Sequence, residues 1–395
     1  MDKTIAILGA TGSVGTQAID VARARGYRVD LLTANRDFTA MESFARELRP
    51  RYVAMADESA AHELTLRLAD TNIKVIGGET GVLEGIFASR ADTVVNSILG
   101  EAGLRPSLAV IDANKRLALA NKESLVIAGE IVMARAKERG VDVLPVDSEH
   151  CAIFQSMKAG RHSEVKRLIL TASGGPFFGC TREQLGRVTR EDALAHPTWK
   201  MGKKITVDSA TLMNKGFEVI EAVHLFGIPA DKIEVVVHRE SILHSAVEYI
   251  DNSVVGELSV PDMRMCVQYA VDYPSRCPST SSELDLFSVG KLTFFRPDTE
   301  AFPFLALAKR LAGAGGAMPA VMNAADEVAV DAFLRGELSF IGIYDTVLEV
   351  CDRLSARSAE HTLDGIRESD REARALAREF IENKTTAKKI GGNVS

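Results

Sequence analysis

The residues Ile5-Ala6-Ile7-Leu8-Gly9-Ala10-Thr11-Gly12-Ser13-Val14-Gly15 carry the strongest structural signal in the chain. An apolar run is followed by three glycines spaced three apart, and a helix pattern begins at once. Glycines let the backbone approach a pyrophosphate, and free N–H groups at a helix N-terminus bind its charge. We therefore predict a dinucleotide site, although a glycine-rich turn without a ligand gives the same pattern.

Strand and helix patterns alternate from this turn to about residue 147. Such alternation is typical of a parallel sheet covered by helices on both faces. We therefore predict an α/β fold in which residues 1–147 form a Rossmann-type domain. The further strands are expected at residues 27–33, 52–55, 74–78, 93–98, 116–120 and 141–144.

The tip of the second strand indicates which dinucleotide is bound. An acid at this tip suits the ribose of NAD, whereas a nearby arginine suits the extra phosphate of NADP. Here Ala34 and Asn35 are followed by Arg36, which favours NADPH. Asp37 lies close enough to leave NAD open as the minority alternative.

Asn121, Lys122 and Glu123 follow the strand at 116–120 and open a helix. Residues at the carboxyl end of a parallel strand line the ligand crevice. Lys122 is therefore placed to reach a cofactor or a substrate. An exposed lysine at a helix start is nearly as compatible with the sequence.

The segment Pro145-Val146-Asp147-Ser148-Glu149-His150 marks the end of this half. Asp147 and Glu149 are two residues apart, so at an extended strand end both carboxylates point to one side. Two such anions repel each other unless a hard cation lies between them, which predicts half of a Mg²⁺ or Mn²⁺ site. The alternative is that these acids only cap the following helix.

A small-residue turn and a long irregular segment follow the strand at 167–172. The turn begins at Ser173 and can present a hydroxyl and backbone groups to an anion. Residues 174–204, with His196 and the only tryptophan, Trp199, are predicted to form a lid that excludes water from a substrate. The alternative is that Trp199 simply anchors a loop to the core.

A helix with Asp208 or Ser209 as its N-cap is predicted to gather Asn214, Lys215 and Glu218 on one face. A hydroxyl, an amide and an ammonium group suit a phosphate. Glu218 would add a third carboxylate to the predicted metal site. A surface Lys–Glu pair is the alternative.

The remaining sequence bounds the architecture and the setting of the protein. We expect an α+β catalytic domain at 148–272, a linker at 273–298, a C-terminal helical bundle at 299–382 and a disordered tail at 383–395. No membrane-spanning stretch and no signal peptide are recognisable, and five scattered cysteines suit a reducing cytoplasm. A net charge of −7 without a basic stripe argues against nucleic acid as a partner.

These motifs, in this order, resemble those of the 1-deoxy-D-xylulose 5-phosphate reductoisomerase family from Ile5 to about Phe333. The family's usual His-Pro-Gln-Ser is replaced by His238-Arg239-Glu240-Ser241, which adds two charges and leaves the position of Ser241 open. The cofactor rim at 34–36 also departs from the usual Gly-Lys/Arg-Asn. The motifs lie at 9–15, 119–124, 145–150, 173–177, 196–199, 207–211, 213–218 and 261–264.

The resemblance implies an NADPH- and metal-dependent enzyme that isomerises and reduces 1-deoxy-D-xylulose 5-phosphate to 2-C-methyl-D-erythritol 4-phosphate, by retro-aldol and aldol steps before hydride transfer. It also implies a homodimer and Mg²⁺ or Mn²⁺, with Co²⁺ as a further option. Two alternatives stay open: an aspartate-semialdehyde-type or sugar-phosphate dehydrogenase that does not isomerise, which would not need a metal, and a non-catalytic NADP-sensing protein.

By resemblance, the metal ligands are Asp147, Glu149 and Glu218, and the phosphate ligands are Ser173, Ser209, Asn214 and Lys215. Ser148 and His196 would contact the carbohydrate, and Lys122 would orient the metal-bound oxygens or assist proton transfer. The cofactor would lie on Thr11, Gly12, Ser13, Val14, Ala34, Asn35 and Arg36, with Asn121, Lys122, Glu123, Ala172 and Gly202 near the nicotinamide and Trp199 and Met201 in the lid.

Overall fold

A computed structural model describes residues 3–199, 201–355 and 362–391 of the chain. These residues form two compact units, each with its own sheet and its own core. Unit 1 consists of Met1–Leu125, Glu130–Lys158 and Leu258–Asp285, and unit 2 consists of Val126–Gly129, Ala159–Glu257 and Leu286–Ser395.

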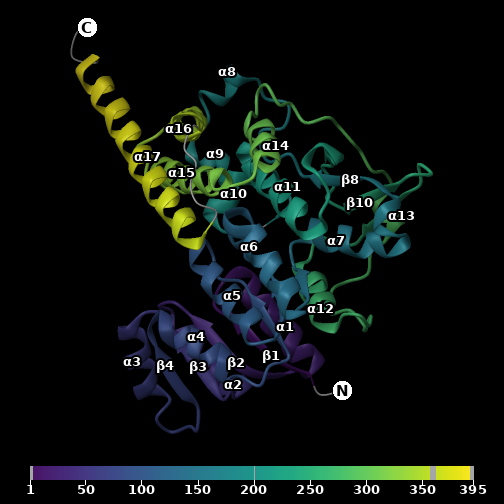
Figure 1. Ribbon diagram of the computed structural model, residues 1–395, viewed down its shortest axis with the longest axis vertical. Coiled ribbons are helices and arrows are strands. Elements are labelled where there is room, and N and C mark those ends of the chain that lie inside the picture. Colours follow the sequence, from purple (N-terminus) through teal and green to yellow (C-terminus); the bar gives the residue numbers. More distant parts are fainter. Residues whose placement is uncertain (1–2, 200, 356–361, 392–395) are drawn as a thin grey trace. The chain divides into compact units, whose positions relative to one another are not determined.

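Unit 1 is built on a seven-stranded sheet in the order β4-β3-β2-β1-β5-β6-β7, and all the neighbouring strands are parallel. Most of this unit is coloured purple to blue in Figure 1. The strands are β1 (Thr4–Leu8), β2 (Arg28–Ala34), β3 (Tyr52–Met55), β4 (Lys74–Gly77), β5 (Thr93–Asn96), β6 (Arg116–Leu119) and β7 (Val143–Pro145).

Helices cover both faces of this sheet, as the alternating pattern predicts. Side chains alternate across a strand, so Leu32 packs with α1, α2, α3 and α12, whereas Leu31 contacts α4 at Gly85 on the other face. The helices are α1 (Ser13–Arg25), α2 (Phe38–Leu48), α3 (Glu58–Arg67), α4 (Gly78–Ala88), α5 (Leu104–Asp112), α6 (Glu123–Arg139), α7 (Ser148–Ser156) and α12 (Met263–Asp272).

Unit 2 combines a four-stranded sheet with a group of helices. The sheet has the order β11-β10-β8-β9, with β8 antiparallel to β10 and parallel to β9. The strand at 243–249 was not recognised in the sequence. The strands are β8 (Val165–Ala172), β9 (Ile233–Val237), β10 (Leu243–Tyr249) and β11 (Val254–Leu258).

The helices of unit 2 pack around a core in which the rings of Phe304 and Tyr344 lie 4.5 Å apart. A parallel sheet with helices, a second sheet and a helical C-terminal region confirm the predicted fold class. The helices are α8 (Arg182–Leu185), α9 (Arg190–Ala193), α10 (Lys203–Thr211), α11 (Met213–Phe226), α13 (Leu286–Val289), α14 (Phe304–Ala314), α15 (Met318–Leu334), α16 (Phe340–Leu354) and α17 (Leu363–Gly391).

The C-terminal tail differs from its prediction. Helix α17 continues to Gly391, so residues 383–391 are helical rather than disordered, and residues 392–395 lie outside the described part of the chain. The three lysines and the one alanine of residues 383–391 are good helix formers, and the Lys384 ammonium donates to the Asp345 carboxylate at 2.7 Å. Among the described residues, no helix is both long and apolar enough to cross a membrane.

Candidate active site

The glycine turn of unit 1 lies between β1 and α1, and its geometry requires glycine. Gly9 has a φ of 78°, and a Cβ there would lie 2.8 Å from the Ser97 carbonyl oxygen. A Cβ on Gly15 would lie 2.1 Å from the Gly9 carbonyl oxygen. Gly12 is the N-cap of α1 and supplies no side-chain cap, so the backbone alone forms this end of the helix. Such a bare helix N-terminus fits a pyrophosphate.

Arg36 stands just beyond the end of β2 and is exposed over 81% of its side chain. Its Nε donates to Asp57 at 3.0 Å. A backbone hydrogen bond from Ala60 and the Arg36 guanidinium keep the pKa of Asp57 low. Asp37, the acid that left NAD open, accepts from Ala40 N and caps α2.

The Asn121 side chain is buried and fixes the loop after β6. Its Nδ2 lies within 3.0 Å of the Ile98 and Gly100 carbonyl oxygens and 2.8 Å from the Glu123 carboxylate. Its Oδ1 accepts from Ser124 N at 2.9 Å. Asn121 therefore aligns the start of α6 with the loop at 98–100, while its contact with a cofactor stays a prediction.

Asp147 has two roles within unit 1. One of its oxygens accepts from the Lys122 ammonium at 2.9 Å, and both side chains are mostly buried. The other oxygen accepts from the backbone N–H groups of Glu149 and His150 and so caps α7. The alternative to a metal role, helix capping, therefore accounts for one oxygen of Asp147. The other oxygen accepts from Lys122.

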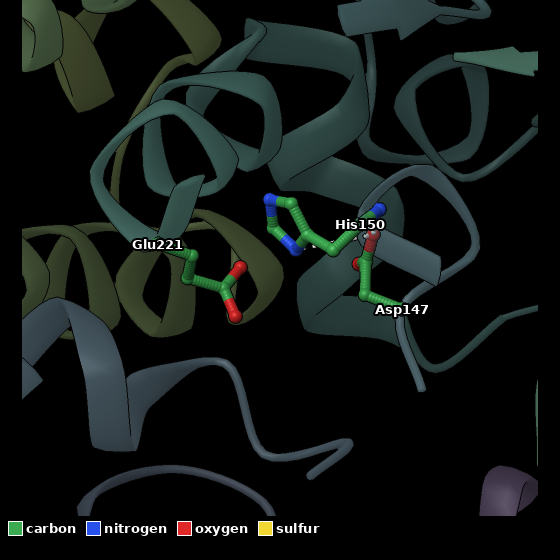
Figure 2. Close-up of side chains that lie close together, drawn as sticks. All are labelled: Asp147, His150 and Glu221. Carbon is green, nitrogen blue, oxygen red and sulfur yellow. Dashed lines mark hydrogen bonds and ion pairs between the residues drawn. The ribbon is translucent and has the colours of Figure 1, made fainter. Parts of the chain in front are cut away.

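The predicted strand-end geometry of Asp147 and Glu149 is corrected by this cap. The strand β7 ends at Pro145, and Glu149 lies in the first turn of α7, where an acid suits the helix dipole. Ser148 Oγ donates to Glu149 at 2.5 Å. Figure 2 shows Asp147 beside His150, whose Nδ1 lies 3.6 Å from the Asp147 carboxylate; Glu221, also drawn there, belongs to α11 of unit 2.

In unit 2, His196 joins two serines from separate elements. Its Nε2 lies 3.0 Å from Ser173 Oγ, after β8, and 3.1 Å from Ser209 Oγ, on α10. Its Nδ1 accepts from the backbone N–H groups of Thr198 and Trp199. A neutral imidazole must then carry its proton on Nε2 and donate toward the serines.

The electrostatic surroundings of His196 favour this neutral form. Burial, and secondarily the positive charge of Arg239, lower the pKa of His196 below its usual 6.5. His196 is therefore an N–H donor at neutral pH, beside two hydroxyl groups that both donate and accept.

Helices α10 and α11 meet at Leu212, which corrects the prediction that Asp208 or Ser209 caps one helix. The N-cap of α10 is Gly202, and Ser209 lies inside this helix. Leu212 has a φ of 60° and separates the two helices. The unusual left-handed leucine could not be read from the sequence, because glycine usually occupies such a position.

Asn214, Lys215 and Glu218 converge in the first turns of α11. Asn214 Nδ2 donates to one Glu218 oxygen at 2.6 Å, and the Lys215 ammonium donates to the other. The side chains of Lys215 and Glu218 are only 4% and 1% exposed. The alternative of a solvated surface pair is therefore wrong.

The segment predicted as a lid contains the short helices α8 and α9 and an irregular stretch that ends at Gly202. The Trp199 ring lies 6.3 Å from the His244 ring, and the Gly202 carbonyl accepts from Thr206 Oγ1 at 2.8 Å. Residue 200 lies outside the described residues. The roles of Trp199, Met201 and Gly202 toward a ligand stay predictions.

Hydrogen bonds to His238 and Glu240 hold the loop at 238–241, where the sequence departs from the family's usual motif. His238 accepts from the backbone N–H groups of Ile242 and Leu243, and Glu240 accepts from Thr293. Ser241 has a φ of 52° within this loop. The sequence alone predicts no role for Arg239. It shows only that an arginine stands where the family usually has a proline.

Comparisons with known proteins match nearly the whole chain. Residues 5–129 match the family model of 1-deoxy-D-xylulose 5-phosphate reductoisomerase, and residues 143–226 and 258–376 match models of C-terminal domains of that enzyme. The reductoisomerase of Symbiobacterium thermophilum is 49% identical over 96% of this chain and 99% of its own length. The chain belongs to the 1-deoxy-D-xylulose 5-phosphate reductoisomerase family, whose members are NADP-dependent oxidoreductases. The resemblance inferred from the sequence is confirmed.

Other members of the family agree in sequence and in structure. The reductoisomerase of Exiguobacterium sibiricum is 48% identical over 95% of this chain and 98% of its own length. The solved reductoisomerase of Zymomonas mobilis in complex with NADPH is 39% identical, with a TM-score of 0.91 over 97% of this chain and all of that one. A solved reductoisomerase in complex with NADPH, fosmidomycin and magnesium is 36% identical, with a TM-score of 0.90 over 96% of this chain and 98% of that one.

Proposed function

We propose that this protein converts 1-deoxy-D-xylulose 5-phosphate and NADPH into 2-C-methyl-D-erythritol 4-phosphate and NADP⁺ with the help of a divalent metal ion. The product belongs to the non-mevalonate route to isoprenoids. The observation that carries the proposal is the 49% identity to a family member over 96% of the chain. Two solved relatives bind NADPH, and one of these also binds magnesium.

Unit 1 would bind NADPH. The glycine turn supplies backbone N–H groups for the pyrophosphate, and residues 11–14 line it. Arg36, exposed and next to Asn35 and Ala34, would meet the 2′-phosphate as a charged donor. Asn121, Lys122 and Glu123, together with Ala172 and Gly202 of unit 2, would lie toward the nicotinamide.

Asp147 and Glu149 of unit 1 would hold the metal together with Glu218 of unit 2. Carboxylate oxygens are the donors that Mg²⁺ and Mn²⁺ prefer, and Co²⁺ would also fit them. Lys122 pairs with Asp147 and Lys215 pairs with Glu218, so an ammonium group lies beside each of these two carboxyl groups. When bound, the metal supplies Lewis acidity toward the carbonyl and hydroxyl oxygens of the substrate.

Protein groups would position the rest of the substrate. Ser173 and Ser209, which share His196, and Asn214 with Lys215 offer hydroxyl, amide and ammonium donors to a phosphate. The neutral His196 and Ser148 would bond to the sugar hydroxyls. Lys122, held by Asp147, would orient the reacting oxygens or transfer a proton, and the lid would exclude water.

We further propose a cytoplasmic homodimer. Strand β11 lies at the edge of the second sheet, and Val254 on it is 55% exposed. An edge strand presents backbone groups that a second copy can pair with. All five cysteines are free, which suits a reducing compartment.

The direct test is NADPH oxidation followed at 340 nm with 1-deoxy-D-xylulose 5-phosphate. Oxidation should require Mg²⁺ or Mn²⁺ and stop when EDTA is added. Oxidation that continues at the same rate in EDTA would contradict the metal role. No oxidation with any metal would contradict the substrate.

A further inference from the structure

The loop after β9 brings the guanidinium group of Arg239 against the carbonyl oxygens of the turn that begins at Ser173. Arg239 Nη1 donates to the Ser173 carbonyl oxygen at 2.7 Å and to the Gly175 carbonyl oxygen at 2.6 Å. Gly174 and Gly175 both have left-handed backbone, with φ values of 77° and 63°. One guanidinium nitrogen therefore donates to both ends of this turn, at Ser173 and at Gly175.

This arrangement gives the turn two distinct sides. Arg239 occupies the carbonyl side, whereas Gly175 N donates to Ser173 Oγ at 3.3 Å on the other side. His196 Nε2 also meets the Ser173 hydroxyl, and the same nitrogen lies 3.1 Å from Ser209 Oγ. Backbone N–H groups that face one direction in a left-handed turn favour an anion.

Neighbouring atoms crowd the turn at 173–175, so residues larger than glycine do not fit at its centre. A Cβ on Gly174 would lie 2.8 Å from the Val237 side chain, and one on Gly175 would lie 2.7 Å from the Ser209 carbonyl oxygen. The turn is thus packed between β9 and α10. Its carbonyl groups need donors there, and Arg239 supplies them.

Arg239 is itself held in place. The Arg239 guanidinium carbon lies 5.3 Å from the centre of the Phe178 ring, and Glu240, the next residue, bonds to Thr293 instead. Within the described part of the chain, no carboxylate forms an ion pair with Arg239. A cation without a carboxylate partner raises the positive potential of its surroundings.

We propose that Arg239 is a positioning residue of the substrate-phosphate site, which holds the turn at 173–175 open to the phosphate and adds positive charge behind it. The inference rests on the proposed function, since it names a further residue for the same site. Arg239 acts through the Ser173 turn and through its charge, and it touches neither the reacting carbons nor the cofactor.

The test compares Arg239→Gln and Arg239→Lys with Glu240→Gln, a control that removes the neighbouring charge and leaves Arg239 intact. Arg239→Gln should raise KM for 1-deoxy-D-xylulose 5-phosphate and the inhibition constant of inorganic phosphate by about tenfold, with kcat changed less than about twofold. Arg239→Lys should fall between wild type and Arg239→Gln. Glu240→Gln should resemble wild type, and NADPH affinity should be the same in all four proteins.

A second readout separates this role from a purely structural one. The His196 ring resonance, titrated with inorganic phosphate, should shift at about tenfold higher phosphate in Arg239→Gln than in wild type. Unchanged phosphate constants in a folded Arg239→Gln variant would overturn the inference, and so would an equal loss of NADPH affinity. If wild type binds phosphate but never turns over the sugar phosphate, the proposed function fails while the phosphate titration still decides the role of Arg239.

Discussion

The two units build their parts of the proposed site from different materials. In unit 1 the turn at Gly9–Gly15 is made of backbone, and Gly9 and Gly15 are required because a Cβ on either would lie under 3.0 Å from a backbone oxygen. In unit 2 the polar groups are side chains, some buried and some half-buried, with His196 between two serines and the Glu218 carboxylate accepting from an amide and an ammonium group. A variant that damages the turn of unit 1 should therefore leave phosphate binding by unit 2 intact, and a variant in unit 2 should leave NADPH binding by unit 1 intact.

A backbone site depends on space, whereas a side-chain site depends on charge and hydrogen-bond partners. The first tolerates any residue whose Cβ fits. The second does not tolerate the loss of one partner, because the remaining polar groups are already out of water. Variants of each kind can test this difference.

Glu218→Gln should have the largest effect. The change removes a proposed metal ligand and the carboxylate to which Lys215 donates. We expect kcat to fall by at least about a hundredfold, and the free energy of unfolding by about 3 kcal/mol, with NADPH affinity preserved. Steady-state kinetics, denaturant unfolding and fluorescence titration with NADPH measure these three quantities. Glu234→Gln, on the surface of β9 in the same unit, is the control; wild-type turnover in Glu218→Gln would sink the metal assignment.

Gly15→Ala should damage the opposite unit. The new Cβ would lie 2.1 Å from the Gly9 carbonyl oxygen, and relieving that clash costs about 1–3 kcal/mol. We expect the Kd for NADPH to rise roughly tenfold to a hundredfold, while inorganic phosphate still binds to unit 2 with wild-type affinity. Gly313→Ala in α14, where the added methyl meets open space, is the matched control. Normal NADPH binding by Gly15→Ala would show that the turn does not contact the cofactor.

Arg36→Gln tests a side chain in unit 1, where the rest of the proposed cofactor site is made of backbone. Loss of its charge should raise the Kd for NADPH about tenfold and leave the Kd for NADH unchanged, because only NADPH carries the 2′-phosphate. Parallel titrations with the two cofactors measure this. The exposed Arg67, at the end of α3, serves as a control in Arg67→Gln. An equal loss for both cofactors would remove Arg36 from phosphate recognition.

Asp326→Asn should have the smallest effect of these variants. It tests how buried charge in unit 2 makes the stability depend on pH. Lys204 donates to both Asp208 and Asp326, at 2.6 and 2.7 Å, and both carboxyl groups are buried. Burial raises the pKa of each, and for Asp208 the charge of Asp326 raises it further. A raised folded-state pKa means that stability is present below the unfolded pKa of about 3.9 and is lost as pH rises through the folded pKa.

The wild-type free energy of unfolding should therefore fall as pH rises in that window, by up to about 1.4 kcal/mol per pH unit for one proton. Asp326→Asn leaves one carboxylate for Lys204 and should flatten the slope. Denaturant unfolding at a series of pH values measures it, with Asp331→Asn on the exposed face of α15 as the control. Parallel curves for wild type and Asp326→Asn would contradict the raised pKa of this buried carboxyl pair.

The same difference explains what could be predicted from the sequence. The strand, glycines and first helix are neighbours in the chain, so local pattern sufficed for the Rossmann-type sheet and its turn. Apolar periodicity also predicts the C-terminal helices, but it does not predict the last turns of α17, because a polar helix end has the composition of a disordered tail.

Features that depend on tertiary contact could not be predicted in the same way. The break at Leu212 has a residue type that rarely adopts left-handed backbone, and α7 begins with the cap by Asp147 rather than after an extended strand end. The bonds of Arg239 join segments more than sixty residues apart, so no local pattern shows them. The residues of unit 2 were gathered by resemblance to a family, not by spacing alone.

The carbon skeleton of the product tests the central claim most directly. The product formed from 1-deoxy-D-xylulose 5-phosphate, NADPH and Mg²⁺ can be identified by ¹³C NMR and mass spectrometry. The account predicts a branched 2-C-methyl tetritol phosphate, with one NADPH oxidised for each molecule formed. A straight-chain 1-deoxypentitol phosphate, formed by reduction without rearrangement, would contradict it.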